Sequence, residues 1–405
     1  MRRGVRAAVR SMTALTSAAV LAGAGQVWSL QQQLDSQVVT SRAAIPMPRP
    51  TPVGTEFTAL LVGLDARTDA GGNPLPLALL DALHAGPDEG QLHTDTIILL
   101  HVPAAAGEPA VAISVPRDSF VPIAGDRGTH KINSAYGYGM RDAEDELRRQ
   151  GITGAELDRR AREAGRRTLV STVEELTGAS IDHYAEINMA GFVELTEALG
   201  GVPVCLNQPV RDSYSGVDLP AGPHVVSGTG ALAFVRQRHG LAYGDLDRIG
   251  RQQAFAAGLA QRVMAAGTLA DPAAMRRLVG VVTRHVVLDA GWNLDQALSQ
   301  VRRLSGDELR FHTIPTGRPD LRTPVDGIAV EIDEEAVREF VHVTLTGPPA
   351  GATPTGSPRP TAVPRTDGPE ATASAKPART PRTTVVEPTT TSPAVITADG
   401  VPCVD

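Results

Sequence analysis

The chain has 405 residues, enough for one large domain or for two small domains with flanking segments. Its formal net charge of −7 at pH 7 argues against a nucleic-acid-binding protein, which needs a strongly basic surface. We therefore expect no nucleic-acid partner, and any basic patch must be local.

The N-terminal region predicts a membrane anchor. Residues 1–10 are arginine-rich and form a short cytoplasmic arm, and residues 11–34 are uncharged. Arginines before an apolar run keep that side in the cytoplasm and place the rest of the chain outside. Residues 22–24 (AGA) also fit a signal-peptidase site, so a cleaved signal is the alternative. The length of the run and Trp28 near its outer end favour a single-pass anchor in the cell membrane.

The remaining chain divides into four parts. Residues 35–55 are polar and then proline-rich, which predicts a stalk. Residues 56–346 alternate strand-like and helical segments, which predicts a single α/β/α sandwich domain around a central mixed sheet. Residues 347–399 are rich in Pro and Thr and are predicted to be disordered, and residues 400–405 form a cysteine-bearing C-terminus.

The predicted elements of the domain follow from these patterns. We expect strands at residues 58–63, 96–102, 110–115, 184–188, 202–206, 231–235 and 309–313. We expect helices at residues 77–84, 142–150, 154–177, 189–199, 248–266, 272–287 and 294–303.

The chain contains two cysteines, Cys205 after the strand-like GVPV and Cys403 near the C-terminus. Outside the cytoplasm, an even number of cysteines favours disulfide formation. We therefore predict a Cys205–Cys403 disulfide that ties the C-terminus to the domain. Two free thiols are the alternative, because the sequence does not show the geometry of the pair.

Two aspartates lie at the ends of apolar runs: Asp65 in LLVGLDAR and Asp95 in HTDTIILLHV. Arg67 follows the first, and Arg117 follows another apolar strand, where Asp118 could orient it. Mg²⁺ binds through one or two carboxylates plus phosphate oxygens, and guanidinium groups hold the remaining oxygens. Each motif alone also fits a surface ion pair or a turn. Together they predict a pyrophosphate site with a divalent metal, Mg²⁺ or Mn²⁺.

The segment HKINSAYGYG contains Lys131 and Asn133 in a predicted loop. Lys131 and Lys376 are the only lysines of the chain, and Lys376 lies in the low-complexity tail. Where arginine is the usual cation, a single lysine favours a site that needs a compact ammonium group. We expect Lys131 and Asn133 to bind substrate phosphate; a solvent-facing Lys131 is the alternative.

The segment FVRQRHGLAYGDLDRIGRQQ is the densest in charge. Arg236 and Arg238 are expected to share one side of an extended chain, and a glycine-containing loop follows them. Asp247 is expected to cap the next helix, whose N-terminus favours anions. Asp245 is the freer carboxylate and the candidate general base. The candidate site residues of this segment are Arg236, Arg238, Asp245, Arg248 and Gln252.

Six segments in this order resemble the LytR-CpsA-Psr family of cell-envelope phosphotransferases. They are GLDAR, TDTIILLHV, SVPRDSFVPI, HKINSAYGYG, EINMAGFVELTEALGGVPV and FVRQRHGLAYGDLDRIGRQQ, and they span roughly residues 58–265. The GVPVCLN and ADGVPC segments resemble the actinobacterial members. Leu64 departs from the family pattern, as does the long stretch of residues 68–92 between the two candidate metal ligands.

The resemblance implies a membrane-anchored enzyme with an extracytoplasmic catalytic domain. Such an enzyme transfers a glycopolymer from a polyprenyl-pyrophosphate carrier to a peptidoglycan hydroxyl. Asp65 and Asp95 would bind Mg²⁺, Asp245 would lie near the reacting phosphorus, and helices carrying Phe192 and Phe255 would line a lipid tunnel. The residues that would contact the pyrophosphate are Arg67, Arg117, Lys131, Arg236, Arg238, Arg248 and Gln252.

Two other functions remain open at the level of sequence. A polyprenyl-pyrophosphatase would use the same metal and arginines, with water in place of the sugar hydroxyl. A non-catalytic envelope regulator or lipid-binding module would need neither the metal nor the arginines. The sequence shows no helix-turn-helix pattern, and the arm at residues 1–10 is too short to be a regulatory domain.

Overall fold

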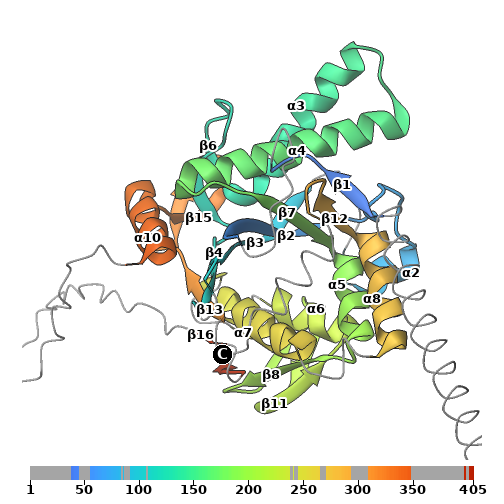
Figure 1. The fold of residues 1–405 in the computed structure, drawn as a ribbon, viewed down its shortest axis with the longest axis vertical. Coiled ribbons are helices and arrows are strands. Elements are labelled where there is room, and N and C mark those ends of the chain that lie inside the picture. Colours follow the sequence, from blue (N-terminus) through green and yellow to red (C-terminus); the bar gives the residue numbers. More distant parts are fainter. Residues whose placement is uncertain are drawn as a thin grey trace, which may run out of the picture.

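The computed structural model covers the predicted domain and the end of the C-terminus (Figure 1). It describes residues 38–44, 55–83, 85, 92–105, 108–237, 240, 245–264, 271–292, 309–347, 396–397 and 401–405. The predicted anchor at residues 11–34 and the predicted helix at residues 294–303 lie outside these ranges. Within them, no helix has both the length and the apolar character that crossing a bilayer requires.

An eight-stranded mixed sheet forms the centre of the molecule, in the order β1-β12-β7-β2-β3-β4-β13-β16. β2 lies in the middle, antiparallel to β3 and parallel to β7. The strands are β1 (Val39–Ser41), β2 (Phe57–Asp65), β3 (His93–Val102), β4 (Ala110–Ser114), β7 (His183–Asn188), β12 (Val286–Asp289), β13 (Leu309–Thr313) and β16 (Ile396–Thr397).

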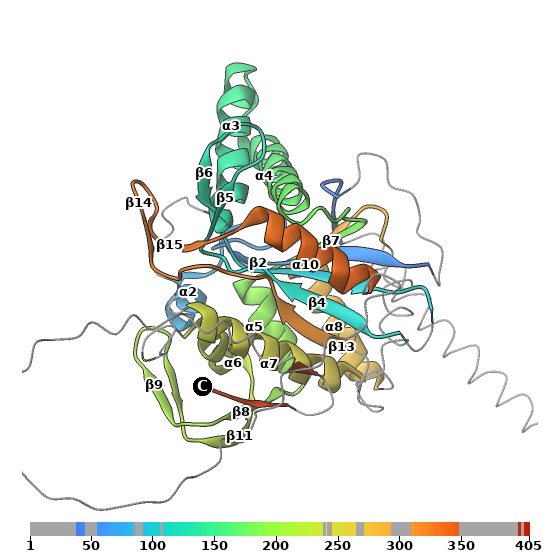
Figure 2. The same ribbon diagram turned by 90° about the vertical axis from the view of Figure 1, so that its left-hand side faces the viewer.

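Helices cover both faces of this sheet (Figures 1 and 2). On one face lie α3 (Ala135–Arg149), α4 (Gly154–Thr177) and α10 (Glu334–Thr346). On the other lie α5 (Met189–Ala198), α6 (Gly228–Arg236), α7 (Asp245–Met264) and α8 (Pro272–His285). Alternate residues of β2 face the two layers: Leu60 and Val62 pack with Leu169 of α4, whereas Ala59 packs with Ala257 of α7. The predicted α/β/α sandwich around a mixed sheet is therefore confirmed.

Smaller sheets extend the two helical layers. One sheet contains β5 (Ser119–Pro122), β6 (Thr129–Lys131), β14 (Leu321–Thr323) and β15 (Gly327–Glu331). A second contains β8 (Val202–Leu206), β11 (Gly222–Val226) and β17 (Cys403–Val404). A third pairs β9 (Val210–Asp212) with β10 (Val217–Leu219). Two short helices, α2 (Leu77–Ala82) and η1 (Ile132–Ser134), complete the fold. β17 pairs in parallel with β8, with Cys403 opposite Cys205, and these two residues form the predicted disulfide.

The strand predicted at residues 231–235 is wrong, because this segment belongs to helix α6. A short, continuously apolar run such as ALAFV fits a buried strand or a buried helix equally well, so its periodicity does not decide between them. All of Ala231–Val235 is buried, and Ala231 and Phe234 are completely so. The helix predicted to reach residue 287 also ends earlier, since Val286 begins β12.

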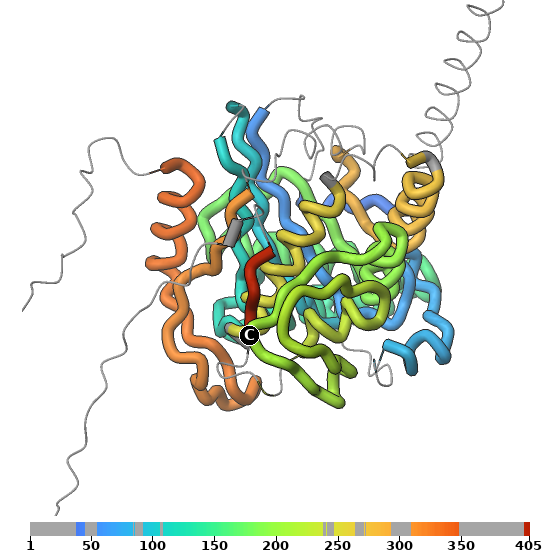
Figure 3. The backbone as a smooth tube through the Cα atoms, turned by 90° about the horizontal axis from the view of Figure 1, so that it is seen from below, coloured from blue at the N-terminus to red at the C-terminus, as the bar shows by residue number. Residues whose placement is uncertain are grey.

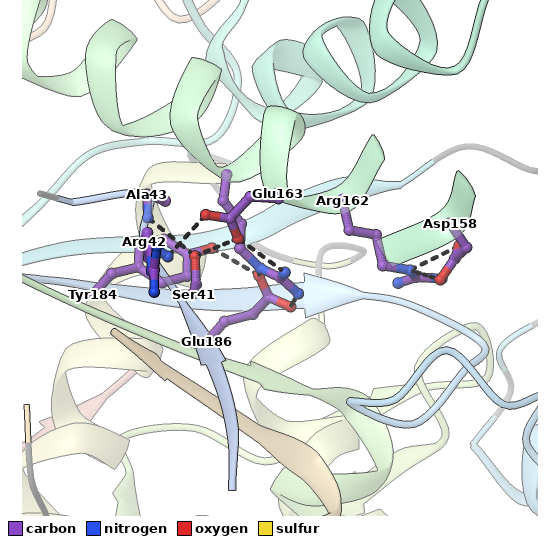
Figure 4. Close-up of polar contacts among 9 residues, drawn as sticks. Ser41, Arg42, Ala43, Asp158, Arg162, Glu163, Tyr184 and Glu186 are labelled. Atoms are coloured by element: carbon purple, nitrogen blue, oxygen red, sulfur yellow. Dashed lines mark hydrogen bonds and ion pairs between the residues drawn. The ribbon is translucent and has the colours of Figure 1, made fainter. Parts of the chain in front are cut away.

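The predicted stalk at residues 35–55 is wrong in one part, because Val39–Ser41 forms edge strand β1, paired in parallel with β12. Side-chain contacts hold this strand against α4 (Figure 4). Ser41 Oγ and the N–H of Arg42 each donate to the Glu163 carboxylate over 2.8 Å. The β-branched residues of VVTS suit an edge strand, and this preference outweighs the polar character of the surrounding segment.

Candidate active site

A cavity lies between the C-terminal end of β2 and helices α5, α6 and α7. Its walls include the β2–β3 strand ends and the first residues of α5. Five of the site residues predicted from the sequence line it: Asp65, Asp95, Arg236, Arg248 and Gln252.

A β-bulge brings the two aspartates to the same cavity. Gly63 of β2 pairs with Thr96, but the next β2 residue pairs with Thr94, so Asp95 is the extra residue of β3. In a regular strand, Asp95 and Thr96 would face opposite sides of the sheet. Here both line the cavity, because a bulge re-aims the side chain at its position. The bulge thus turns Asp95 toward the side that Asp65 faces.

Asp65 is held by an arginine and lies near a second negative charge. Arg67 Nη1 donates to Asp65 Oδ1 over 2.9 Å, and Arg67 Nη2 donates to the main-chain oxygen of Ala85 over 2.6 Å. Burial raises the pKa of Asp65, and the Asp95 carboxylate adds to the increase, while Arg67 and Arg236 oppose it. A cation between the two carboxylates would relieve their repulsion.

Asp95 lies in a more positive environment. Arg117 donates a hydrogen bond to its carboxylate. Burial acts to raise the pKa of Asp95, but Arg117 and Arg248 together outweigh it and hold the pKa below its ordinary value. Asp118 Oδ1 lies 3.8 Å from Arg117 Nε and 3.4 Å from Lys131 Nζ, so it connects these two cations. Lys131 ends β6 and is therefore held by a strand, not by the loop that the sequence predicts.

The remaining predicted residues are placed as follows. Arg236, the last residue of α6, donates through Nη1 to the main-chain oxygen of Leu83 over 2.9 Å. Asn133 is buried in η1, where its N–H donates to the Arg117 carbonyl, and it is not among the residues that line the cavity. All of Arg238 and the side chain of Asp245 lie outside the described part of the chain.

Helix α7 is described from Asp245 onward, so the prediction that Asp247 caps it is wrong. Asp247 instead lies in the first turn, where a carboxylate still interacts favourably with the positive end of the helix. Arg248 lies in the same turn and is 3 % exposed. Its guanidinium is thus fixed at the helix end that faces the cavity.

An apolar cavity of about 290 Å³ adjoins the charged one. The lining residues that the two cavities share are Gly63, Thr96, Ile187, Phe192, Val235 and Gln252. The rings of Phe192 on α5 and Phe255 on α7 lie 5.0 Å apart between centroids. Other walls are Leu61, Ile98, Leu195 and Leu259. The arrangement suits a ligand with an anionic group at one end and a hydrocarbon chain at the other.

Sequence reasoning missed several lining residues of the charged cavity, including Thr96, Asn188 and Met189. Asn188 caps α5, accepting from the N–H of Gly191 over 2.7 Å, and its side-chain amide donates to the Thr68 carbonyl over 2.7 Å. An asparagine at the end of a strand and directly before an apolar helix is an N-cap signal that could have placed the start of α5 at the cavity.

The donor set can be tested against a divalent metal. Among the described residues, no three His, Cys, Asp or Glu side chains gather closely enough to hold a metal by themselves. Two carboxylates at one cavity nevertheless fit the usual Mg²⁺ site, in which substrate phosphates and water supply the other ligands. The residues therefore fit a metal that binds together with an anionic substrate.

Known proteins resemble this chain in sequence. A model of the LytR_cpsA_psr family matches residues 28–341. The cell wall biosynthesis protein LcpA of Corynebacterium glutamicum is 44% identical over 287 residues, which cover 71% of this chain and 55% of LcpA. TagU of Oceanobacillus iheyensis, named as a polyisoprenyl-teichoic acid–peptidoglycan teichoic acid transferase, is 36% identical over 177 residues, covering 43% of this chain and 48% of TagU. The chain thus spans about half the length of the curated relatives it matches.

Solved structures share the fold. A LytR-Csp2A-Psr enzyme from Actinomyces oris matches with a TM-score of 0.51 and 21% identity, over 75% of this chain and 95% of that one. TagT bound to LI-WTA matches with a TM-score of 0.50 and 20% identity, over 75% of this chain and 96% of that one. The family model covers most of the chain, and the fold is the one these structures have. The chain belongs to the LytR-CpsA-Psr family.

Proposed function

We propose that this protein transfers a glycopolymer, with its linking phosphate, from a polyprenyl-pyrophosphate carrier to a hydroxyl group of peptidoglycan. The observation that carries the proposal is the continuity of a charged cavity with an apolar one. The charged cavity would hold the pyrophosphate, and the apolar cavity would hold the first part of the polyprenyl chain. The teichoic acid transferase names of relatives such as TagU support the same class of reaction.

The residues of the charged cavity suit phosphoryl transfer. Arg236 and Arg248 line the cavity, while Arg67 and Arg117 pair with its two aspartates without being among the lining residues. Four arginines against two aspartates leave an excess of positive charge for a pyrophosphate. Phosphoryl transfer depends mainly on positioning and on charge stabilisation, and fixed guanidinium groups provide both.

In the proposed reaction, the acceptor hydroxyl oxygen attacks the phosphorus that carries the sugar. The bond between this phosphorus and the bridging oxygen breaks, and polyprenyl monophosphate leaves. The arginines stabilise the charge that develops on the leaving phosphate. We assign the hydroxyl proton to Asp245, on the grounds of its place in the sequence after Arg238 and before Arg248.

We propose Mg²⁺, or Mn²⁺ in its place, as the cofactor, with Asp65 and Asp95 as its protein ligands. The metal would neutralise part of the pyrophosphate charge. Its removal by a chelator is expected to abolish transfer, and added Mg²⁺ or Mn²⁺ to restore it. Activity that survives chelation would contradict this assignment.

We further propose that residues 11–34 anchor the protein in the cell membrane, with the domain on the outer side. A carrier lipid is confined to the membrane, so an anchored enzyme encounters its donor by diffusion in the plane of the membrane. Protease treatment of intact protoplasts is expected to digest the domain; protection of the domain would contradict this orientation.

The decisive experiment has two parts. Mass spectrometry of lipid that co-purifies with the soluble domain is expected to detect a polyprenyl phosphate or pyrophosphate. Product analysis with and without peptidoglycan then separates the possible reactions: transfer needs the acceptor, whereas a pyrophosphatase releases its product without it. Turnover retained by Asp65→Ala would contradict the proposed site, and a lipid bound without any turnover would indicate a binding module.

A further inference from the structure

Arg251 is a charged side chain that the proposed function does not use. It lies on α7 between Arg248 and Gln252, which line the charged cavity, but it does not line the cavity itself. It is fully buried, with 0 % of its surface exposed. Burial of an arginine is costly unless hydrogen bonds and opposite charges compensate it, so its partners indicate its role.

On one side, Arg251 holds the end of α6. Its Nη1 donates to the side-chain oxygen of Gln237, and its guanidinium lies 5.4 Å from the ring centroid of Phe234. Gln237 is 2 % exposed and is the first residue after α6, where the chain turns from helical to extended backbone. In the sequence it stands directly between Arg236 and Arg238. Arg251 is thus hydrogen-bonded to Gln237, which stands between these two arginines in the sequence.

On the other side, Arg251 is held by the C-terminal strand, which lies beside α7 (Figure 3). Its Nε donates to the main-chain oxygen of Asp405 over 2.6 Å. The strand itself is fixed by the Cys205–Cys403 disulfide and by the Asn207 N–H, which donates to the Val404 carbonyl over 2.9 Å.

We infer that Arg251 and Gln237 are positioning residues for the transfer reaction: the buried guanidinium fixes the chain directly after Arg236 so that Arg236 meets the reacting phosphate. The inference rests on the proposed function. A displacement of Arg236 by about 1 Å would weaken transition-state stabilisation strongly, since catalytic geometry tolerates little error. Through Arg251, the C-terminal strand supports the active site although it lies far from it in sequence.

The test uses Arg251→Met, Gln237→Leu and the double variant in the full-length chain. Each single variant is expected to lower kcat about 10- to 100-fold, with the donor KM changed less than about threefold, because the lost contact serves the transition state. The double variant replaces both partners of the Arg251–Gln237 hydrogen bond by apolar groups of similar shape, so it should regain the thermal stability that either single variant loses by leaving the other partner unsatisfied, but not the part that comes from the Asp405 contact. Its kcat is expected to stay low and to be no worse than that of either single variant.

Two further variants separate positioning from folding. Arg262→Met removes another α7 arginine, whose Nε donates to the Leu199 carbonyl over 2.8 Å, and should leave kcat unchanged. Arg251→Lys keeps the charge but has no planar fork with which to reach both partners, so an intermediate kcat is expected. Recovery of wild-type kcat in the double variant, or an equal loss in Arg262→Met, would overturn the inference.

A second readout does not depend on the reaction. Hydrogen exchange of the peptide covering residues 228–237 should be faster in Arg251→Met than in Arg262→Met. Equal exchange in these variants would overturn the positioning contact itself. A wild-type protein that transfers nothing to peptidoglycan, while this difference in exchange persists, would instead contradict the proposed function.

Discussion

Asp65 and Asp95 both line one cavity, and the arginines around them affect the pKa of each carboxyl group differently. Burial and the neighbouring carboxylate raise the pKa of Asp65, whereas Arg117 and Arg248 overcome burial and lower the pKa of Asp95. Asp95 is therefore the carboxylate better prepared to stay ionised. Asp65 would gain most from a metal, because a cation opposes both causes of its raised pKa.

At the residue scale, Arg236→Ala is expected to lower kcat of the transfer reaction by about 10²–10³-fold, as the loss of one oxyanion donor does. The guanidinium lines the charged cavity and is fixed by its bond to the Leu83 carbonyl. Steady-state kinetics with a polyprenyl-pyrophosphate donor would measure the change. Arg211→Ala is the matched control, since Arg211 forms an ion pair on the surface with its side chain 86 % exposed. An equal loss in both variants would contradict a specific role for Arg236.

At the scale of elements, α4 is joined to β7 by a buried ion pair (Figure 4). Arg166 donates to both carboxylate oxygens of Glu186, over 3.0 and 3.1 Å, and the Tyr184 hydroxyl donates to the same group over 2.7 Å. Glu163 holds strand β1, and its Oε2 lies 3.9 Å from Arg166 Nη1. One network thus connects the edge strand β1, α4 and the central sheet.

This network predicts a pH-dependent stability. Burial acts to raise the pKa of Glu186, but Arg166 and Tyr184 outweigh it and hold the pKa below the ordinary 4.5. The stabilisation by ionised Glu186 is therefore complete above pH 4.5 and is lost as the pH falls through the lower folded-state pKa. Glu186→Gln should cost about 3–5 kcal/mol near neutral pH, because it removes the bidentate carboxylate partner of the buried Arg166 guanidinium.

Thermal unfolding of wild type and Glu186→Gln across the acid range would measure this difference, which should shrink below pH 4.5. Glu156→Gln, on the exposed side of the same helix, should change the unfolding temperature little. If the difference in stability between wild type and Glu186→Gln does not vary with pH, Glu186 is not ionised in the folded protein.

The position of α7 depends on a close approach to β8. A Cβ atom at Gly258 would collide with the main-chain oxygen of Pro203. Gly258→Val is therefore expected to cost about 1–3 kcal/mol by overpacking, and to lower kcat, because the same helix carries Arg248 and Gln252. Gly250→Ala is the control on this helix: among described residues nothing lies within 4 Å of the added Cβ, so it should be neutral or stabilising.

Urea unfolding and transfer kinetics of these two variants would test the helix position. A Gly258→Val protein as stable and as active as wild type would show that β8 and α7 can move apart without loss of stability or activity.

The Cys205–Cys403 disulfide closes a loop of 198 residues. Cross-links of this kind stabilise mainly by restricting the unfolded chain, and we expect Cys403→Ser to cost about 2–5 kcal/mol. Chemical unfolding with and without reductant would measure it. Reductant should destabilise the wild type to the level of Cys403→Ser and leave that variant unchanged. A wild type that is insensitive to reduction would contradict a stabilising role.

Local sequence patterns predict most of the elements and the charged residues that line the cavity. The predicted bounds of α4, β8 and β13 agree with the structure, because capping residues and regular periodicity mark them. Asp65, Asp95, Arg236, Arg248 and Gln252 line one cavity, and the sequence predicts all five as site residues from charged motifs whose order resembles that of a known family.

Only the tertiary structure decided which residues meet. ALAFV became helix α6 because burial on all sides removes the periodicity that separates helix from strand. The bulge at Asp95 depends on the register between β2 and β3, which neither strand encodes alone. The contacts of Arg251 with Gln237 and Asp405 join segments that only packing brings together. Local patterns act over a few residues, whereas an active site is assembled by contacts across the whole chain.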